Sequence, residues 1–174
     1  MQDEAPDRRE PTHGAASVGV LRAGGTFRLV ATAPIESGAE VMRIEGRLTS
    51  RPSRTSVQIG DDLHVDVPEG LDLERVLDTH AWRFMNHACD PTVRLAGRAI
   101  VALRRIAAGE EITFDYNTTE LDMSTPFVCA CGAPACRRAP GRGFAHLSPD
   151  EQRRLLPSLA EHLRRRVADG APRP

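Results

Sequence analysis

A short stretch near the middle of the chain combines three kinds of chemically capable side chain. Residues 83–91 read Arg-Phe-Met-Asn-His-Ala-Cys-Asp-Pro. Asn86 and His87 can donate and accept hydrogen bonds, and Cys89 is a soft metal ligand when it is a thiolate. Pro91 fixes the backbone and keeps the residue before it out of a helix. Core packing does not require this mixture, so the sequence predicts a functional site here.

The other three cysteines lie close together, about forty residues further along the chain. Cys129, Cys131 and Cys136 are separated by a glycine and a proline, which suit a backbone that folds around an ion. Structural zinc sites take four ligands, and four cysteines are a common set. Cys89 is the one cysteine left to complete it. We therefore predict one zinc ion bound by these four residues; disulfides and unpaired thiols are the alternatives.

The elements that position these residues are mostly short strands. Runs with β-type residues are broken by Gly-rich turns, and two pairs of runs have hairpin spacing. The expected strands cover residues 17–21, 26–31, 40–44, 55–59, 63–67, 92–95, 98–103 and 111–114. A helix is expected over residues 71–78, and a second begins at Ser148, with Pro157 interrupting it. The pattern predicts a β-dominated domain.

Composition limits the kinds of protein this can be. The chain has 174 residues, of which 40% are hydrophobic, enough for one domain with a real core. A net charge of −1 gives no general reason to expect nucleic acid or an anionic membrane as a partner. We find no apolar run of about 18 residues and no secretory signal, so we expect a cytoplasmic protein that does not enter membranes. A reducing compartment favours metal binding over disulfides.

With these residues in view, the sequence resembles a SET-domain protein of bacterial type with a post-SET zinc segment. Residues 83–91 match the family's Arg-Phe-x-Asn-His-x-Cys-x-Pro-Asn motif up to its last position, where Thr92 stands. Residues 111–116, Glu-Ile-Thr-Phe-Asp-Tyr, match its Glu-Leu-Thr-Phe-Asp-Tyr motif. The three later cysteines match the post-SET pattern Cys-x-Cys-x₄-Cys, and residues 31–38 resemble its Ala-Thr-x-x-Ile-x-x-Gly segment.

The resemblance implies a mostly β fold with some helix, of the pseudoknotted SET type, in which the two main motifs cross. It also implies a zinc-bound post-SET loop and a C-terminal helix. The boundaries that follow are a tail without fixed structure over 1–15, a SET domain over 16–118, a post-SET zinc segment over 119–146, and a C-terminal helix and tail over 147–174.

The resemblance further implies methyl transfer from S-adenosylmethionine to a protein lysine. The lysine amine must arrive neutral although its pKa in solution is about 10.4, and a narrow dry channel favours the neutral form. Alignment of amine, methyl and sulfur does most of the catalysis. By resemblance Tyr116 lines the channel and orients the amine, and Phe114 sets how many methyls fit. The cofactor-binding residues implied are Arg83, Asn86, His87, Phe27, Arg28 and Phe127.

Departures from the family pattern keep other functions open. Thr26 and Arg28 take the places of the family's Gly-x-Gly, and Ile44 stands where a tyrosine is common. These changes favour a SET-fold protein that binds the cofactor or another small molecule without methylating protein, either a pseudoenzyme or a repurposed metabolic enzyme. A third hypothesis is a zinc-stabilised interaction module whose Arg164-Arg165-Arg166 run binds an acidic partner.

Overall fold

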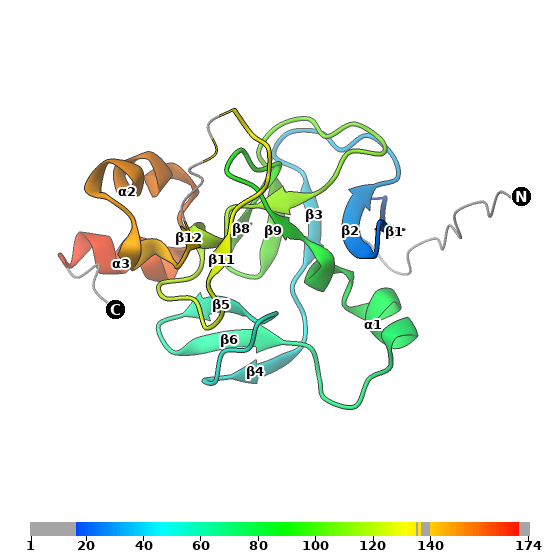
Figure 1. Cartoon of the computed structure of the whole chain (residues 1–174), viewed down its shortest axis with the longest axis horizontal. Coiled ribbons are helices and arrows are strands. Elements are labelled where there is room, and N and C mark those ends of the chain that lie inside the picture. The colour runs from blue at the N-terminus through cyan, green and yellow to red at the C-terminus, as the bar shows by residue number, and fades with distance from the viewer. Residues whose placement is uncertain (1–16, 135, 137–139, 171–174) are drawn as a thin grey trace, which may run out of the picture.

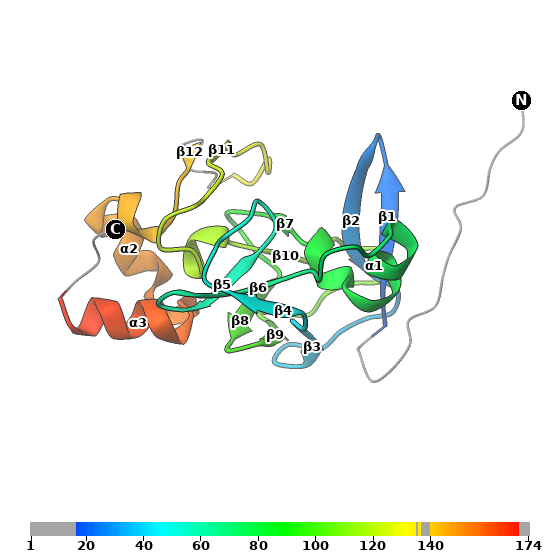
Figure 2. The same ribbon diagram turned by 90° about the horizontal axis from the view of Figure 1, so that it is seen from below.

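The computed structural model describes residues 17–134, 136 and 140–170. The tail predicted over residues 1–15 lies outside this part of the chain. Within it, short strands form five small sheets, with short helices between and after them. Figure 1 shows the C-terminal helices at one end of the molecule and the first hairpin at the other, and Figure 2 confirms this arrangement from below. The predicted β-dominated fold is confirmed.

The first sheet is a hairpin of β1 (Val18–Ala23) and β2 (Thr26–Ala31). Its turn is Gly24-Gly25, where φ is 57° and 80°. Positive φ at both central residues is the type of turn whose twist matches that of two antiparallel strands, and glycine adopts it without strain. The sequence predicted a break between two strands at this Gly-Gly pair, and the structure shows that the break is a hairpin turn.

Two three-stranded sheets form the middle of the molecule. In one, β9 (Ala99–Ala102) lies between β3 (Glu40–Arg43) and β8 (Val93–Ala96). In the other, β6 (Leu63–Asp66) lies between β4 (Arg47–Thr49) and β5 (Val57–Gly60). Both hairpins predicted from the sequence, β8–β9 and β5–β6, are present and antiparallel.

Strand β4 was not among the predicted strands, and its position depends on the glycine before it. A Cβ atom on Gly46 would lie 2.3 Å from the carbonyl oxygen of Asp66 at the end of β6. The close approach of the two backbones therefore requires glycine at this position. It allows β4 to pair along β6 through Arg47 and Asp66.

The fourth sheet is a parallel pair that the sequence did not predict. It joins β7 (Asn86–His87) to β10 (Thr113–Phe114), with Asn86 opposite Thr113 and His87 opposite Phe114. The 3₁₀ helix η1 (Ala81–Phe84) precedes β7, and η2 (Tyr116–Thr118) follows β10. These two-residue strands bring the two longest sequence motifs side by side.

Helices and one small sheet complete the described chain. Helix α1 (Leu73–Thr79) begins at the side-chain cap of Asp72, within two residues of the prediction. Strands β11 (Phe127–Val128) and β12 (Pro140–Gly141) pair before η3 (Phe144–His146).

The C-terminal helix predicted from Ser148 is divided into three pieces at Pro157. They are α2 (Pro149–Leu155), η4 (Leu156–Ser158) and α3 (Glu161–Ala168). The side chains of Ser148 and Glu151 form the predicted capping box at the start of α2.

Two separate hydrophobic clusters hold these elements. The main core lies between the hairpin and the two central sheets, and its largest fully buried side chains are Trp82, Leu29, Ile44, Leu95, Ile100, Ile106 and Ile112. A smaller cluster of Leu121, Phe144, Leu159 and Leu163 attaches the C-terminal helices. None of the helices in the described ranges has the length and apolar character needed to span a membrane.

Candidate active site and metal centre

Tyr116, the single tyrosine of the chain, lies two residues after Phe114, the last residue of β10 in the parallel β7–β10 pair. Its hydroxyl group donates a hydrogen bond to the carbonyl oxygen of Met85, at 2.8 Å. Burial, reinforced by the carboxylates of Glu111 and Glu120, raises the pKa of Tyr116 to about 12. At neutral pH this side chain is therefore a neutral phenol, which can orient a group by hydrogen bonding.

Three further rings surround Tyr116. The centroid distances from its ring are 4.7 Å to Phe114, 5.3 Å to His87 and 5.6 Å to Phe127. The ring of Phe127 reaches this position because Gly141 faces it across the β11–β12 pair, where a Cβ atom would lie 2.3 Å from the ring. Four of the predicted site residues, Phe114, Tyr116, His87 and Phe127, are thus brought together from three segments of the chain.

The imidazole of His87 joins this aromatic group to the cysteines. Its Nδ1 atom accepts a hydrogen bond from the backbone N–H of Tyr116 at 3.3 Å. An Nδ1 that accepts leaves Nε2 as the protonated nitrogen, and Nε2 lies 3.4 Å from the sulfur of Cys89. His87 thus links the Tyr116 backbone and the first cysteine.

A second group of predicted residues gathers where β2 passes the end of β7. The side-chain amide nitrogen of Asn86 donates to the carbonyl oxygen of Phe27 at 3.1 Å and to Oε1 of Glu111 at 2.8 Å. Both donors are therefore used within the protein, which leaves Oδ1 of this exposed side chain available to accept. The guanidinium of Arg28 lies 3.8 Å from the same Glu111 carboxylate. Arg28 and Asn86 thus contact the same carboxylate, that of Glu111.

Arg83 lies apart from both groups, beside Phe84. Its guanidinium lies over the ring of Phe84 at 5.7 Å, and Phe84 in turn packs against Phe27 with centroids 5.0 Å apart. Arg83 also lines a shallow cavity of about 310 Å³ between the loop after β4, the end of β6 and α1. The walls of this cavity are Ser53, Thr55, Asp66, Val67, Pro68, Leu71, Leu73, Val76 and Arg83. The other five predicted cofactor residues also lie in the described part of the chain, and none of them lines this cavity. They are Phe27, Arg28, Asn86, His87 and Phe127.

The four cysteines come together as the sequence predicted. The Sγ atoms of Cys89, Cys129, Cys131 and Cys136 all lie within 4.8 Å of one another, and none is in a disulfide. Cys129 lies 3.7 Å from Cys89 and 3.6 Å from Cys136, measured between the sulfurs. Tetrahedral zinc with Zn–S bonds of about 2.3 Å separates its sulfurs by about 3.8 Å. The cluster therefore fits a zinc ion.

Two thiols of the cluster differ in how readily they lose a proton. Burial raises the pKa of the Cys129 thiol to about 12. At Cys131 burial acts in the same direction, but hydrogen bonds from the backbone N–H groups of Cys89 and Ala133 outweigh it and lower the pKa to about 6. Without a metal, Cys129 is therefore a protonated thiol at neutral pH, and binding a metal ion would remove its proton.

Sequence reasoning missed the contributions of Glu111 and Thr92. Glu111 stands in the matched motif, so its position was visible, but its bond to Asn86 depends on folding. Thr92 replaces the motif's final asparagine, and its buried hydroxyl accepts from the backbone N–H of Thr113 at 2.9 Å. Its backbone N–H donates to the Thr113 carbonyl oxygen at 3.1 Å. The threonine thus holds the two motifs together at β10.

The sequence is similar to SET domains and to histone-lysine N-methyltransferases. A family model described as "SET domain" matches residues 26–117, more than half of the chain. "Histone-lysine N-methyltransferase trithorax" of Drosophila virilis is 33% identical over 136 residues, which cover 70% of this chain and 4% of the relative. "Histone-lysine N-methyltransferase, H3 lysine-4 specific" of Saccharomyces cerevisiae is 45% identical over 64 residues, covering 32% and 6%.

A solved structure shares the fold. The crystal structure of KRYPTONITE in complex with mCHH DNA, an H3(1–15) peptide and SAH superposes with a TM-score of 0.52 at 22% identity. The match covers 69% of this chain and 28% of the other. Since this chain spans a few per cent of the length of the curated relatives it matches, the similarity concerns one domain of each of them.

Proposed function

The chain belongs to the SET domain family, and on that premise we propose that it is an S-adenosylmethionine-dependent protein-lysine N-methyltransferase. The observation that carries the proposal is the group of rings around the β7–β10 pair. There the neutral phenol of Tyr116 packs against His87, Phe114 and Phe127, and all of these except Phe127 stand in the two main motifs of the family. The names of the curated relatives support lysine as the acceptor and a protein as the substrate.

The aromatic group would act on the incoming lysine. Its rings exclude water, and a dry environment disfavours the ammonium form of the amine. S-adenosylmethionine, when bound, supplies a methyl group activated by the positive charge of its sulfonium. Tyr116 keeps its proton at neutral pH and would therefore orient the amine by hydrogen bonding. Phe114, 4.7 Å from Tyr116, would limit the room for further methyl groups.

Asn86 and two arginines would hold the methionine end of the cofactor. Glu111 and the Phe27 carbonyl fix the amide of Asn86 so that Oδ1 can accept from an ammonium group. Arg28 and Arg83 are exposed cations, and Arg83 lies over the ring of Phe84. Either guanidinium can pair with a carboxylate. Cys89, Cys129, Cys131 and Cys136 would bind zinc in a structural role.

Titration calorimetry with S-adenosylmethionine tests the binding part of the proposal. We expect micromolar binding by the wild type and about tenfold weaker binding by Asn86→Ala and by Arg28→Ala. Arg47→Ala is the matched control, because Arg47 is also an exposed strand arginine in an ion pair, at 3.3 Å from Glu69. The absence of heat at high micromolar cofactor, or equal losses in Arg28→Ala and Arg47→Ala, would contradict the assignment.

One observation favours a second candidate, a SET-fold protein that binds the cofactor without methylating protein. Ile44, which stands at a common family tyrosine, is fully buried in the main core, so Tyr116 is the one phenol available to the site. Cofactor binding with no methyl transfer to any protein in a lysate would favour this candidate. The chain itself contains no lysine, so it offers no lysine side chain that could be methylated in its place.

A further inference from the structure

The turn that carries Tyr116 is built around one carbonyl oxygen. The backbone N–H groups of Thr119 and Glu120 both donate to the carbonyl of Tyr116, at 3.2 and 2.9 Å. The residues that follow Tyr116 therefore form one hydrogen-bonded turn, which leads into Leu121. The match to the family model ends at residue 117, inside this turn.

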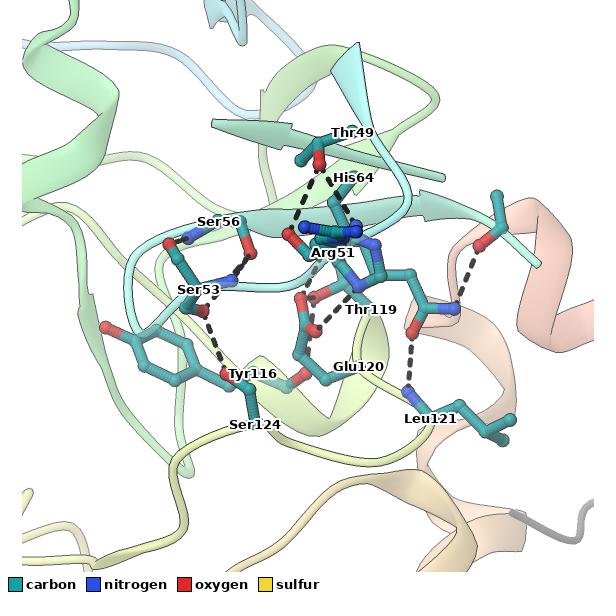
Figure 3. A network of polar contacts seen from close by, with 12 residues as sticks. Thr49, Arg51, Ser53, Ser56, His64, Tyr116, Thr119, Glu120, Leu121 and Ser124 are labelled. Atoms are coloured by element: carbon teal, nitrogen blue, oxygen red, sulfur yellow. Dashed lines mark hydrogen bonds and ion pairs between the residues drawn. The ribbon is translucent and has the colours of Figure 1, made fainter. Parts of the chain in front are cut away.

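Strand β5 holds the turn from one side through a reciprocal pair of hydrogen bonds. The backbone N–H of Gln58 donates to Oε1 of Glu120 at 2.7 Å, and the side-chain oxygen of Gln58 accepts from the backbone N–H of Leu121 at 2.9 Å. Figure 3 shows this contact between the strand and the turn. The side-chain nitrogen of Gln58 is also engaged, donating to the carbonyls of Gly60 and Asp61 at 2.8 and 3.0 Å. Gln58 is buried, so its bonds are shielded from water.

Helix α3 holds the same turn from the other side. Nε2 of the buried His162 donates to the carbonyl oxygen of Thr119 at 2.7 Å. The backbone N–H of Ala160, the residue that caps α3, donates to the carbonyl of Thr118 at 2.8 Å. The C-terminal helix thus supports the backbone that leads from Tyr116.

The carboxyl group of Glu120 faces strands β5 and β6, where it contacts Gln58 and His64. Its side chain is 12% exposed, and its second oxygen lies 3.8 Å from Nε2 of His64 on β6. In Figure 3 the Tyr116 ring extends away from this carboxyl group. Glu120 is therefore placed to act through the backbone of the turn and not on the reacting atoms.

We propose that Glu120 is a positioning residue for methyl transfer: by bonding to Gln58 it fixes the Tyr116 turn to β5, and so sets where the Tyr116 ring lies against His87 and Phe114. This inference rests on the proposed function for its effect on rate. Its structural part can be measured independently, because Tyr116 is the single tyrosine of the chain.

Protein labelled with ¹³C in the tyrosine ring would report the position of Tyr116 through one set of NMR signals, which neighbouring rings shift. In Glu120→Ala we expect those signals to move and kcat to fall about tenfold, while the KM values for cofactor and substrate change less than about twofold. Glu120→Gln keeps an oxygen that accepts from Gln58, so it should restore the signals and most of the rate. Glu69→Ala, which removes an exposed carboxylate beside the same sheet, is the matched control and should match the wild type.

Wild-type Tyr116 signals or wild-type kcat in folded Glu120→Ala would overturn the proposal. Emission from Trp82, the single tryptophan and 2% exposed, reports whether each variant is folded. If Glu120→Ala does not fold, Glu120→Asp replaces it, since this change keeps the carboxylate but shortens its reach to the backbone N–H of Gln58. Unchanged Tyr116 signals in Glu120→Asp would equally refute the proposal. A wild type without methyl transfer would instead refute the proposed function, and the NMR comparison would still test the positioning.

Discussion

Replacing Glu120 by glutamine should make the protein harder to unfold above neutral pH. Burial raises the pKa of the Glu120 carboxyl from its usual 4.5 to about 7, and the hydrogen bonds from Gln58 and Thr119 offset this only in part. The folded protein therefore binds this proton more tightly than the unfolded chain does. The stability that depends on the proton is complete below pH 4.5 and is lost as the pH rises through about 7.

The size of this effect follows from the two pKa values. The difference between 4.5 and about 7 corresponds to about 3 kcal/mol in the free energy of unfolding, lost by the wild type between those pH values. Glutamine has the same shape and keeps an oxygen for Gln58, but it does not ionise. Glu120→Gln should therefore equal the wild type near pH 4.5 and exceed it by up to about 3 kcal/mol at pH 8.

Urea unfolding followed by Trp82 emission at several pH values between 4.5 and 8, with zinc held constant, measures this difference. Burial lowers the pKa values of the nearby His64 and His162, so both bind a proton less readily in the folded protein than in the unfolded chain. His162 contributes alike in wild type and variant, and making the comparison in a His64→Gln background removes the contribution of His64, which lies 3.8 Å from the Glu120 carboxyl group. Two stability curves that stay parallel across the range would refute the reasoning, because Glu120 would then ionise equally in both states.

Three further changes have defined outcomes. Tyr116→Phe removes the hydroxyl that bonds to the Met85 carbonyl and would orient the amine. At about 1.4 kcal/mol, the upper end for one hydrogen bond, it should slow methyl transfer about tenfold with unchanged cofactor affinity by calorimetry; full activity would remove its assigned role. Cys89→Ser should weaken zinc binding at least about 100-fold in a competition titration with a chelator, and an unchanged affinity would exclude Cys89 as a ligand. Gly141→Ala places a Cβ atom against the Phe127 ring and should destabilise the protein to urea by about 1–3 kcal/mol; a loss below that range would show that the ring moves aside freely.

The parts of the fold that the sequence predicted are those with local causes. The Gly24-Gly25 turn, the two later hairpins and the Ser148 cap each follow from neighbouring residues, and each is present in the structure. The four-cysteine cluster was also predictable, because one ion needs four ligands and the chain has four cysteines.

The rest depends on contacts between distant residues. The β7–β10 strands have two residues each, too few for a pattern, and their pairing depends on bonds such as the one between Thr92 and Thr113. Glu120 looks like an ordinary surface residue in the sequence. In the fold its side chain is largely buried and accepts a hydrogen bond from Gln58, 62 positions earlier in the chain. The boundaries placed at residues 118 and 146 remain predictions.

The most direct test of the account is methyl transfer itself. The zinc-loaded protein would be incubated with S-adenosylmethionine carrying a deuterated methyl group and with a protein lysate that includes core histones, and modified peptides would be identified by mass spectrometry. We predict deuterated methyl groups on lysine side chains of a defined set of proteins, and about tenfold less of them with Tyr116→Phe. Cofactor binding without any labelled lysine, or equal labelling by Tyr116→Phe, would contradict the account.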